Sequence, residues 1–196
     1  MKPAVCVLFF VASLIFAQTQ PASPAAPAPA GMDLATLVKQ QFGPTFALQP
    51  KFPTPIITAD FDGDGVEDAA IVAVSQEPFP DSFQFKYTVV DPYNSYFGMS
   101  NPNMSASFST VDPTRNHDLL VILGSGPDAW RSAVPKAKWV MINVPFDEIS
   151  VGRMLVRKDR QPIFVIKAKE AELMTASVYW DAKKKRWRWQ PGDTLQ

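Results

Sequence analysis

Residues Ile56-Ile57-Thr58-Ala59-Asp60-Phe61-Asp62-Gly63-Asp64-Gly65-Val66-Glu67-Asp68-Ala69-Ala70-Ile71-Val72-Ala73-Val74 place an acidic, glycine-containing loop between two apolar runs. The β-branched and small apolar residues on both sides predict two strands joined as a hairpin. The four aspartates of the loop would repel one another in a compact turn unless a cation lay among them. The stretch therefore predicts a β fold and a site for a hard cation.

Calcium is the cation that this spacing favours. The carboxylates of Asp60, Asp62, Asp64 and Asp68 stand at calcium-loop positions 1, 3, 5 and 9, and the main-chain carbonyl of Val66 stands at position 7. Gly65 at position 6 permits the sharp turn that such a loop needs. An EF-hand is excluded, because position 12 is Ile71 instead of glutamate and the flanks resemble strands. A hairpin turn rich in Asp and Gly, without a metal, is the alternative. A structural Ca²⁺ is the preferred interpretation, because only Glu67 is left in the loop to act in catalysis.

The same loop, from Ile57 to Val74, resembles the calcium loop of FG-GAP and VCBS repeats. In that family the cation lies at a turn between two strands, and the repeats assemble into propellers of adhesion and surface proteins. The resemblance implies the same five ligands here. A full propeller is not expected, because the motif occurs once and the chain is too short for four blades. As a whole the chain resembles small exported bacterial proteins that carry one such loop and have no assigned activity.

The first 31 residues predict export. Lys2 is followed by an apolar run and by Ala17, so residues 1–17 are interpreted as a signal peptide. The run is shorter than the roughly 20 residues that span a bilayer, so no transmembrane segment is expected in the mature chain. Residues 18–31 predict a Pro/Ala-rich linker, and residues 32–196 a single α+β domain. The expected location is secreted or periplasmic.

Composition excludes several classes of function. The chain has 19 basic and 19 acidic residues, so no overall field favours nucleic acid, and no nucleic-acid partner is expected. Its single cysteine, Cys6, lies in the predicted signal peptide, so the mature domain would contain no disulfide or thiolate site. A bound calcium ion would then be the one evident element that stabilises the domain in place of disulfides.

The fold class expected for residues 32–196 is α+β, a mainly antiparallel sheet with an N-terminal helix packed on it. The helix is predicted from Asp33 as N-cap to Gly43-Pro44 as stop, with an apolar stripe between them. A further short helix is predicted over residues 128–134. Strands are predicted, from apolar runs between turn signals, over residues 56–59, 69–74, 83–90, 104–111, 119–123, 139–144, 151–156, 163–168, 176–180 and 186–190.

Aromatic residues suggest a ligand surface at two places. Tyr93, Tyr96 and Phe97 lie in a long loop, residues 91–104, which is expected either to pack over the core or to bind a ligand. A C-terminal hairpin carries Trp180 on one strand and Trp187 and Trp189 on the other. These tryptophans are expected to close the core, although Trp beside Arg can also stack on sugars or bases. Alternation from Phe83 to Val89 predicts ordinary core packing.

Few residues of the chain are candidates for a catalytic role. His117 is the sole histidine and is expected at the surface, at a strand start, and Ser125 lacks the G-x-S-x-G spacing of a nucleophile elbow. The expected function is an exported, calcium-stabilised binding or interaction module of the cell envelope or extracellular space, with a glycan or envelope protein as partner. A hydrolase with a carboxylate-based site near the calcium loop or His117 is the alternative. A structural subunit of an envelope assembly is a third hypothesis.

Overall fold

The structure, a computed structural model, describes residues 33–49, 52–75, 81–99, 117–155, 161–171 and 174–192. Its helices and strands are, in chain order, α1 (Leu34–Phe42), β1 (Phe46–Leu48), β2 (Ile56–Ala59), β3 (Asp68–Ser75), α2 (Ser82–Phe85), β4 (Thr88–Val90), α3 (Pro92–Tyr96), β5 (Asp118–Leu123), a 3₁₀ helix (Ala129–Arg131), β6 (Ala137–Met141), β7 (Glu148–Met154), β8 (Ile163–Glu170), β9 (Met174–Asp181) and β10 (Arg186–Pro191).

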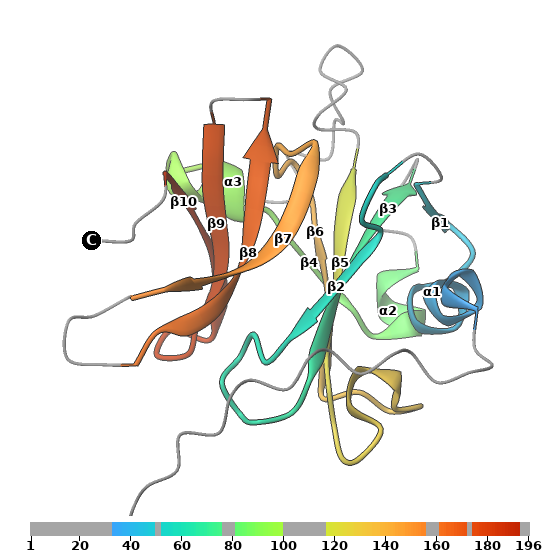
Figure 1. Cartoon of the computed structure of the whole chain (residues 1–196). Coiled ribbons are helices and arrows are strands. Elements are labelled where there is room, and N and C mark those ends of the chain that lie inside the picture. The colour runs from blue at the N-terminus through green and yellow to red at the C-terminus, as the bar shows by residue number, and fades with distance from the viewer. Residues whose placement is uncertain are drawn as a thin grey trace, which may run out of the picture.

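The strands form two sheets, which Figure 1 shows side by side. One sheet has the order β1-β3-β5-β6-β4, with β2 also paired to β3, and the other has the order β10-β9-β8-β7. Neighbouring strands are antiparallel except β4 and β6, which are parallel. The expectation of a mainly antiparallel β domain with an N-terminal helix is confirmed, and the described residues form no closed propeller.

The central strands β3 and β5 are buried on both faces, which explains their continuous apolar sequences. Val72 and Val121 point toward the second sheet, where they join the tryptophans of β10 in one core. Ile71 and Leu120 point the other way and pack with α1 in a second core. The domain thus has three layers, with α1 and α2 on one side of the larger sheet and the smaller sheet on the other (Figure 1).

Helix α1 forms where the sequence predicts it. Leu37, Val38 and Phe42 are buried, as the apolar stripe requires. Gly43 ends the helix with a φ of 97°, and a Cβ there would lie 2.7 Å from the Phe85 ring. Asp33 occupies the N-cap position but makes no side-chain hydrogen bond to the helix backbone; it accepts one from the Thr36 hydroxyl instead.

The predicted strand over residues 83–90 is wrong in its first half. Residues Ser82–Phe85 form the one-turn helix α2, which ends at Lys86 with a φ of 53°. Phe83 is 95% exposed, whereas Tyr87 is buried against α1. A one-turn helix leaves Phe83 and Phe85 on different sides, so their alternation in sequence does not put both in the core.

Three further expectations differ from the structure or lie outside it. The short helix predicted over residues 128–134 is a single 3₁₀ turn, and β1 and α3 were not predicted. Helix α3 begins at Pro92, with the Asp91 carboxylate accepting a hydrogen bond from the Asn94 N–H, so Asp91-Pro92 is a cap and not only a turn. The predicted signal peptide, linker and strand 104–111 lie outside the described residues and stay predictions.

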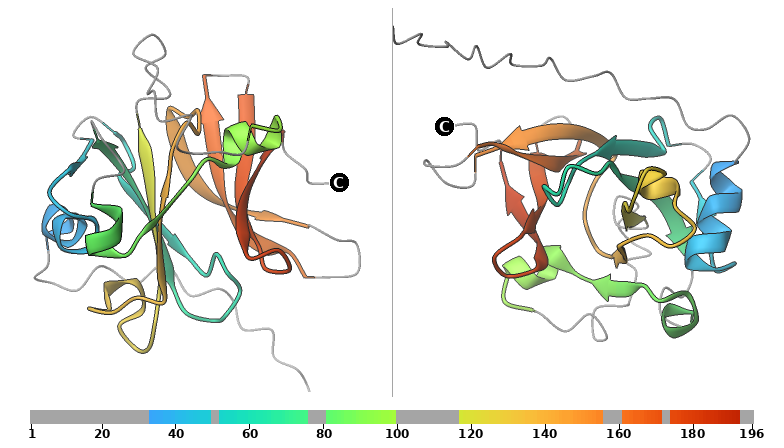
Figure 2. Two further views of the ribbon diagram at one scale, coloured as in Figure 1. Left: turned by 180° about the vertical axis from the view of Figure 1, so that it is seen from behind. Right: turned by 90° about the horizontal axis from the view of Figure 1, so that it is seen from below.

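Helix α3 is the one helix that packs on the smaller sheet in the described part of the chain. Figure 2 shows it beside β10, on the opposite side of the molecule from α1. Tyr93, Tyr96 and Phe97 therefore lie against the C-terminal hairpin, where they contact Trp189.

Candidate functional site

The acidic loop joins β2 to β3, whose pairing closes at Ala59 and Asp68. Gly63 and Gly65 adopt φ values of 79° and 87°, which favour glycine and turn the chain back tightly. The Asp60 carboxylate lies at the centre of this turn and accepts hydrogen bonds from the N–H groups of Gly63, Asp64 and Gly65, at 2.8, 3.0 and 2.8 Å. The predicted hairpin and its glycine turn are both present.

Asp68 is the most buried member of the loop, with 1% of its surface exposed. Its carboxylate accepts hydrogen bonds from the N–H groups of Phe61, Asp62 and Gly124, at 2.8, 3.3 and 2.7 Å. Burial raises the pKa of Asp68 to about 7, and the hydrogen bond from Gly124 opposes this increase by favouring the ionised form. The side chain therefore joins the loop to the end of β5.

Gly124 allows the acidic loop to lie close to the end of β5. A Cβ at Gly124 would lie 2.3 Å from the carbonyl oxygen of Glu67, so only glycine fits there without moving the loop. In the sequence, Gly124 belongs to Gly124-Ser125-Gly126-Pro127, which indicates only a turn. Its partners in the loop are more than fifty residues distant, and no local pattern indicates them.

Three carboxylates converge in the loop. One oxygen each from Asp60, Asp62 and Asp68 lies within 4.8 Å of the other two, and the group is partly buried. Oxygen ligands without nitrogen or sulfur suit a hard cation such as Ca²⁺ or Mg²⁺. The structure therefore contains a carboxylate group that could hold a metal ion, formed by three of the four predicted aspartates.

Asp64 is not a member of this group, and a lysine from another part of the chain pairs with both Asp64 and Asp62. Lys136 Nζ lies 2.6 Å from Asp62 Oδ2 and 2.6 Å from Asp64 Oδ2. The hydrogen bond from Lys136 lowers the pKa of Asp64, and the two carboxylates raise the pKa of Lys136. Val66 contributes its N–H to Asp64 Oδ1 at 2.9 Å, and a role for its carbonyl stays a prediction.

Glu67, the loop residue left over for catalysis, is engaged in structural contacts. Its carboxylate accepts hydrogen bonds from the Thr58 hydroxyl at 3.1 Å and from Trp130 Nε1 at 2.9 Å. Arg131 lies 3.9 Å from the same group. Glu67 thus ties β2 and the loop to the 3₁₀ helix.

His117 precedes β5, as expected, but it is partly buried instead of fully exposed at the surface. Its ring lies 5.5 Å from the Phe52 ring and 5.6 Å from the Phe146 ring, between centroids. Burial lowers its pKa, and its Nδ1 has no hydrogen-bond partner among the described residues. His117 precedes β5 and the acidic loop contacts Gly124 after β5, so about 20 Å of strand separates them.

The next residue, Asp118, is a carboxyl group whose burial was not predicted from the sequence. It has no measurable exposure, and neither oxygen has a hydrogen-bond partner within the described ranges. Desolvation raises its pKa well above the usual value for aspartate. Its position before an apolar run indicates a strand start, and no local pattern indicates that this end of β5 is buried.

The predicted aromatic residues form two groups. Tyr93, Tyr96 and Phe97 of the α3 segment surround Trp189, with ring centroids 5.0, 5.1 and 6.1 Å from it. In the other group Trp187 contacts Trp180, which in turn contacts Trp139, each pair at 5.5 Å.

These residues combine both uses considered from sequence. Trp187 and Trp189 are buried, whereas Tyr96 and Phe97 are 50% and 56% exposed. The segment after Asp91 therefore packs on the core through some rings and presents others to solvent.

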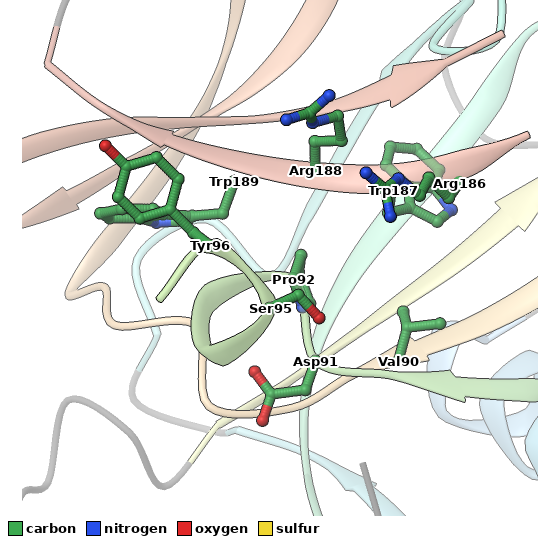
Figure 3. Close-up of a pocket in the computed structure, with 9 residues that line it drawn as sticks. All are labelled: Val90, Asp91, Pro92, Ser95, Tyr96, Arg186, Trp187, Arg188 and Trp189. Atoms are coloured by element: carbon green, nitrogen blue, oxygen red, sulfur yellow. The ribbon is translucent and has the colours of Figure 1, made fainter. Parts of the chain in front are cut away.

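A cavity of about 220 Å³ lies between α3 and β10, and Figure 3 shows the nine residues that line it. Tyr96 and Trp189 stand at one end of the cavity, and Asp91 and Ser95 line the α3 side. The Asp91 carboxylate is buried and already accepts hydrogen bonds from Asn94 and from Asn143 Nδ2, the latter at 2.6 Å. Asp91 therefore shapes this wall and fixes the start of α3.

Comparison with protein-family models, curated proteins and solved structures finds no match to this chain. Within the described ranges, no helix has the length and apolarity of a membrane span. The function must therefore be argued from the loop and the cavity themselves.

Proposed function

We propose that the protein is an exported, calcium-stabilised binding module of the cell envelope or extracellular space. The observation that carries this proposal is the convergence of the Asp60, Asp62 and Asp68 carboxylates within 4.8 Å of one another. A cation among them would relieve their mutual repulsion and fix the β2–β3 turn, which is a structural task. The resemblance of the loop to FG-GAP and VCBS calcium loops supports the same conclusion.

Calcium suits this loop better than magnesium or zinc. Calcium accepts six to eight oxygen ligands in irregular geometry, whereas magnesium requires a near-ideal octahedron and zinc prefers nitrogen or sulfur. In the proposed site Asp60, Asp62 and Asp68 would hold the ion, and Asp64 and the Val66 carbonyl would be further ligands if the ion pairs of Lys136 opened. The ion supplies positive charge that holds the loop closed.

Binding is favoured over hydrolysis by the surroundings of the loop. The Glu67 carboxylate is engaged by Thr58 and Trp130, so it is poorly placed to act as a base. His117 lies at the far end of β5, so a site that combines it with the metal would have to span the strand. The half-exposed rings of α3 above a cavity instead offer a place for a ligand.

Calcium titration tests the metal part of this proposal. At millimolar calcium and a Kd of about 10⁻⁴ to 10⁻³ M, the wild-type protein should gain about 1 kcal/mol of stability. The melting temperature should rise by about 2–4 °C, and a chelator should reverse the rise. Asp62→Ala should remove both the shift and the heat of binding in calorimetry.

A matched control is Asp128→Ala, which deletes an exposed aspartate outside the loop and should keep the calcium response. Equal melting temperatures with calcium and with chelator in the wild type, together with no binding heat, would show that the carboxylate group holds no calcium.

A further inference from the structure

The cavity between α3 and β10 combines an aromatic wall with a polar one. Tyr96 is half exposed, and its ring is held at 5.1 Å and 71° to the buried Trp189. A ring supported in this way is fixed before any ligand arrives, so binding costs little side-chain entropy. Strand β10, which carries Trp189, is an edge strand of its sheet in the described part of the chain, and such edges present main-chain donors and acceptors.

The turn that leads into β10 and the first residues of that strand form a strongly basic segment, called the basic turn below. Lys183, Lys184, Lys185, Arg186 and Arg188 place five cations within six residues of a chain whose total formal charge is zero. The one ion pair that the described residues give this segment joins Arg188 to Asp181, at 3.4 Å. The three lysines and Arg186 are exposed and form no ion pair within the described ranges, although the Lys184 N–H donates a hydrogen bond to the Asp181 carboxylate. The positive charge of this turn is therefore available to a ligand.

We propose that this cavity and the adjoining basic turn, residues 183–188, bind an acidic glycan. Sugar rings offer apolar C–H faces for Tyr96 and hydroxyl groups for the polar walls. A carboxylate, sulfate or phosphate on the glycan would pair with the lysines and Arg186. The inference rests on the proposed binding function and specifies its ligand, and it does not require the calcium loop to hold a metal.

The shape of the site favours a glycan over a membrane surface. The cavity is concave and about 220 Å³ in volume, so a single projecting sugar fits it. The flat headgroup layer of a membrane would contact only the basic turn. An anionic surface would therefore bind through charge alone and would not depend on Tyr96. This difference makes the tyrosine the discriminating residue.

The test measures binding of the whole mature chain to polygalacturonate, dextran sulfate and uncharged dextran by affinity electrophoresis and calorimetry. We expect binding to at least one of the two anionic polymers and none to dextran, and the stronger of the two identifies carboxylate or sulfate as the recognised group. The variant Lys183→Gln/Lys184→Gln/Lys185→Gln should bind about tenfold more weakly, as the loss of three exposed charge pairs predicts. Tyr96→Ser should also lose about tenfold, without changing the salt dependence that the lysines cause.

The control variant Lys39→Gln/Lys169→Gln removes two exposed lysines outside the turn and should bind as the wild type does. Melting temperatures of all variants, measured in parallel, distinguish loss of binding from loss of folding. If the polymers bind equally to wild type and Tyr96→Ser, or bind no better than dextran, the proposal is wrong. Tight binding only to vesicles of phosphatidylglycerol, or only to a single-stranded oligonucleotide, would also overturn it. Glycan binding that persists with chelator, in a protein without a calcium response, would support this inference while refuting the calcium proposal.

Discussion

Asp68→Ala is expected to lower the free energy of unfolding by about 3–5 kcal/mol, the largest loss among the loop aspartates. The change leaves the N–H groups of Phe61, Asp62 and Gly124 without their common acceptor, and two of these three hydrogen bonds are buried. An unpaired buried donor costs about 1–3 kcal/mol, because water cannot replace the lost partner. Urea unfolding followed by tryptophan fluorescence, with chelator present, measures the effect without any contribution from a metal.

Asp60→Ala is the matched control, since Asp60 also accepts hydrogen bonds from three main-chain N–H groups, but these hydrogen bonds are exposed to solvent. Water can satisfy those donors, so a loss below about 1 kcal/mol is expected. Equal losses for the two variants would contradict the role assigned to burial. Asp68→Asn should fall between them, because it retains one acceptor oxygen.

Asp118→Asn is expected to stabilise the protein at pH 8 and to change its stability little at pH 4. The folded protein holds the Asp118 proton more tightly than the unfolded chain does, because its pKa is raised by burial. Stability is therefore complete below the ordinary aspartate pKa and falls as the pH rises toward the folded value, by up to about 1.4 kcal/mol per pH unit. The neutral amide has no charge to lose and should not show this fall.

Unfolding curves from pH 4 to 8 measure the difference between wild type and variant. Asp68, whose pKa is raised to about 7, adds a fall of the same sign to both proteins, so subtracting the two profiles isolates Asp118. Parallel profiles, with the variant less stable at every pH, would show that the Asp118 carboxylate is paired and ionised in the fold.

The parts predicted correctly from sequence are those in which local signals agree. The apolar stripe and Gly43 locate α1, and the loop between residues 60 and 67 locates the β2–β3 hairpin. By contrast, Phe83 and Phe85 alternate as in a strand but lie in a one-turn helix, because so short an element leaves no periodicity that could identify it. Helix α3 carried a usable signal, the Asp91-Pro92 pair followed by Asn94, which also marks a capped helix start.

The candidate site shows the same division between local and distant information. The aspartates of the loop were identified because they lie within nine residues of one another. Lys136 and Gly124 could not be identified from the sequence as partners of the loop, because each contacts it only after the chain has passed through β5. Similarly, the meeting of Tyr96 with Trp189 depends on the packing of α3 against β10, and no spacing in the sequence encodes it.

Lys136 has a consequence for how the loop responds to its surroundings. Its ammonium group is attached to the same fold as Asp62 and Asp64, so its effective concentration at these carboxylates is high whatever the solution contains. An incoming cation must compete with this tethered one, which weakens its apparent affinity and keeps the turn charge-balanced when the ion is scarce. A single lysine can thus set the threshold concentration at which the loop exchanges an internal counterion for an external one.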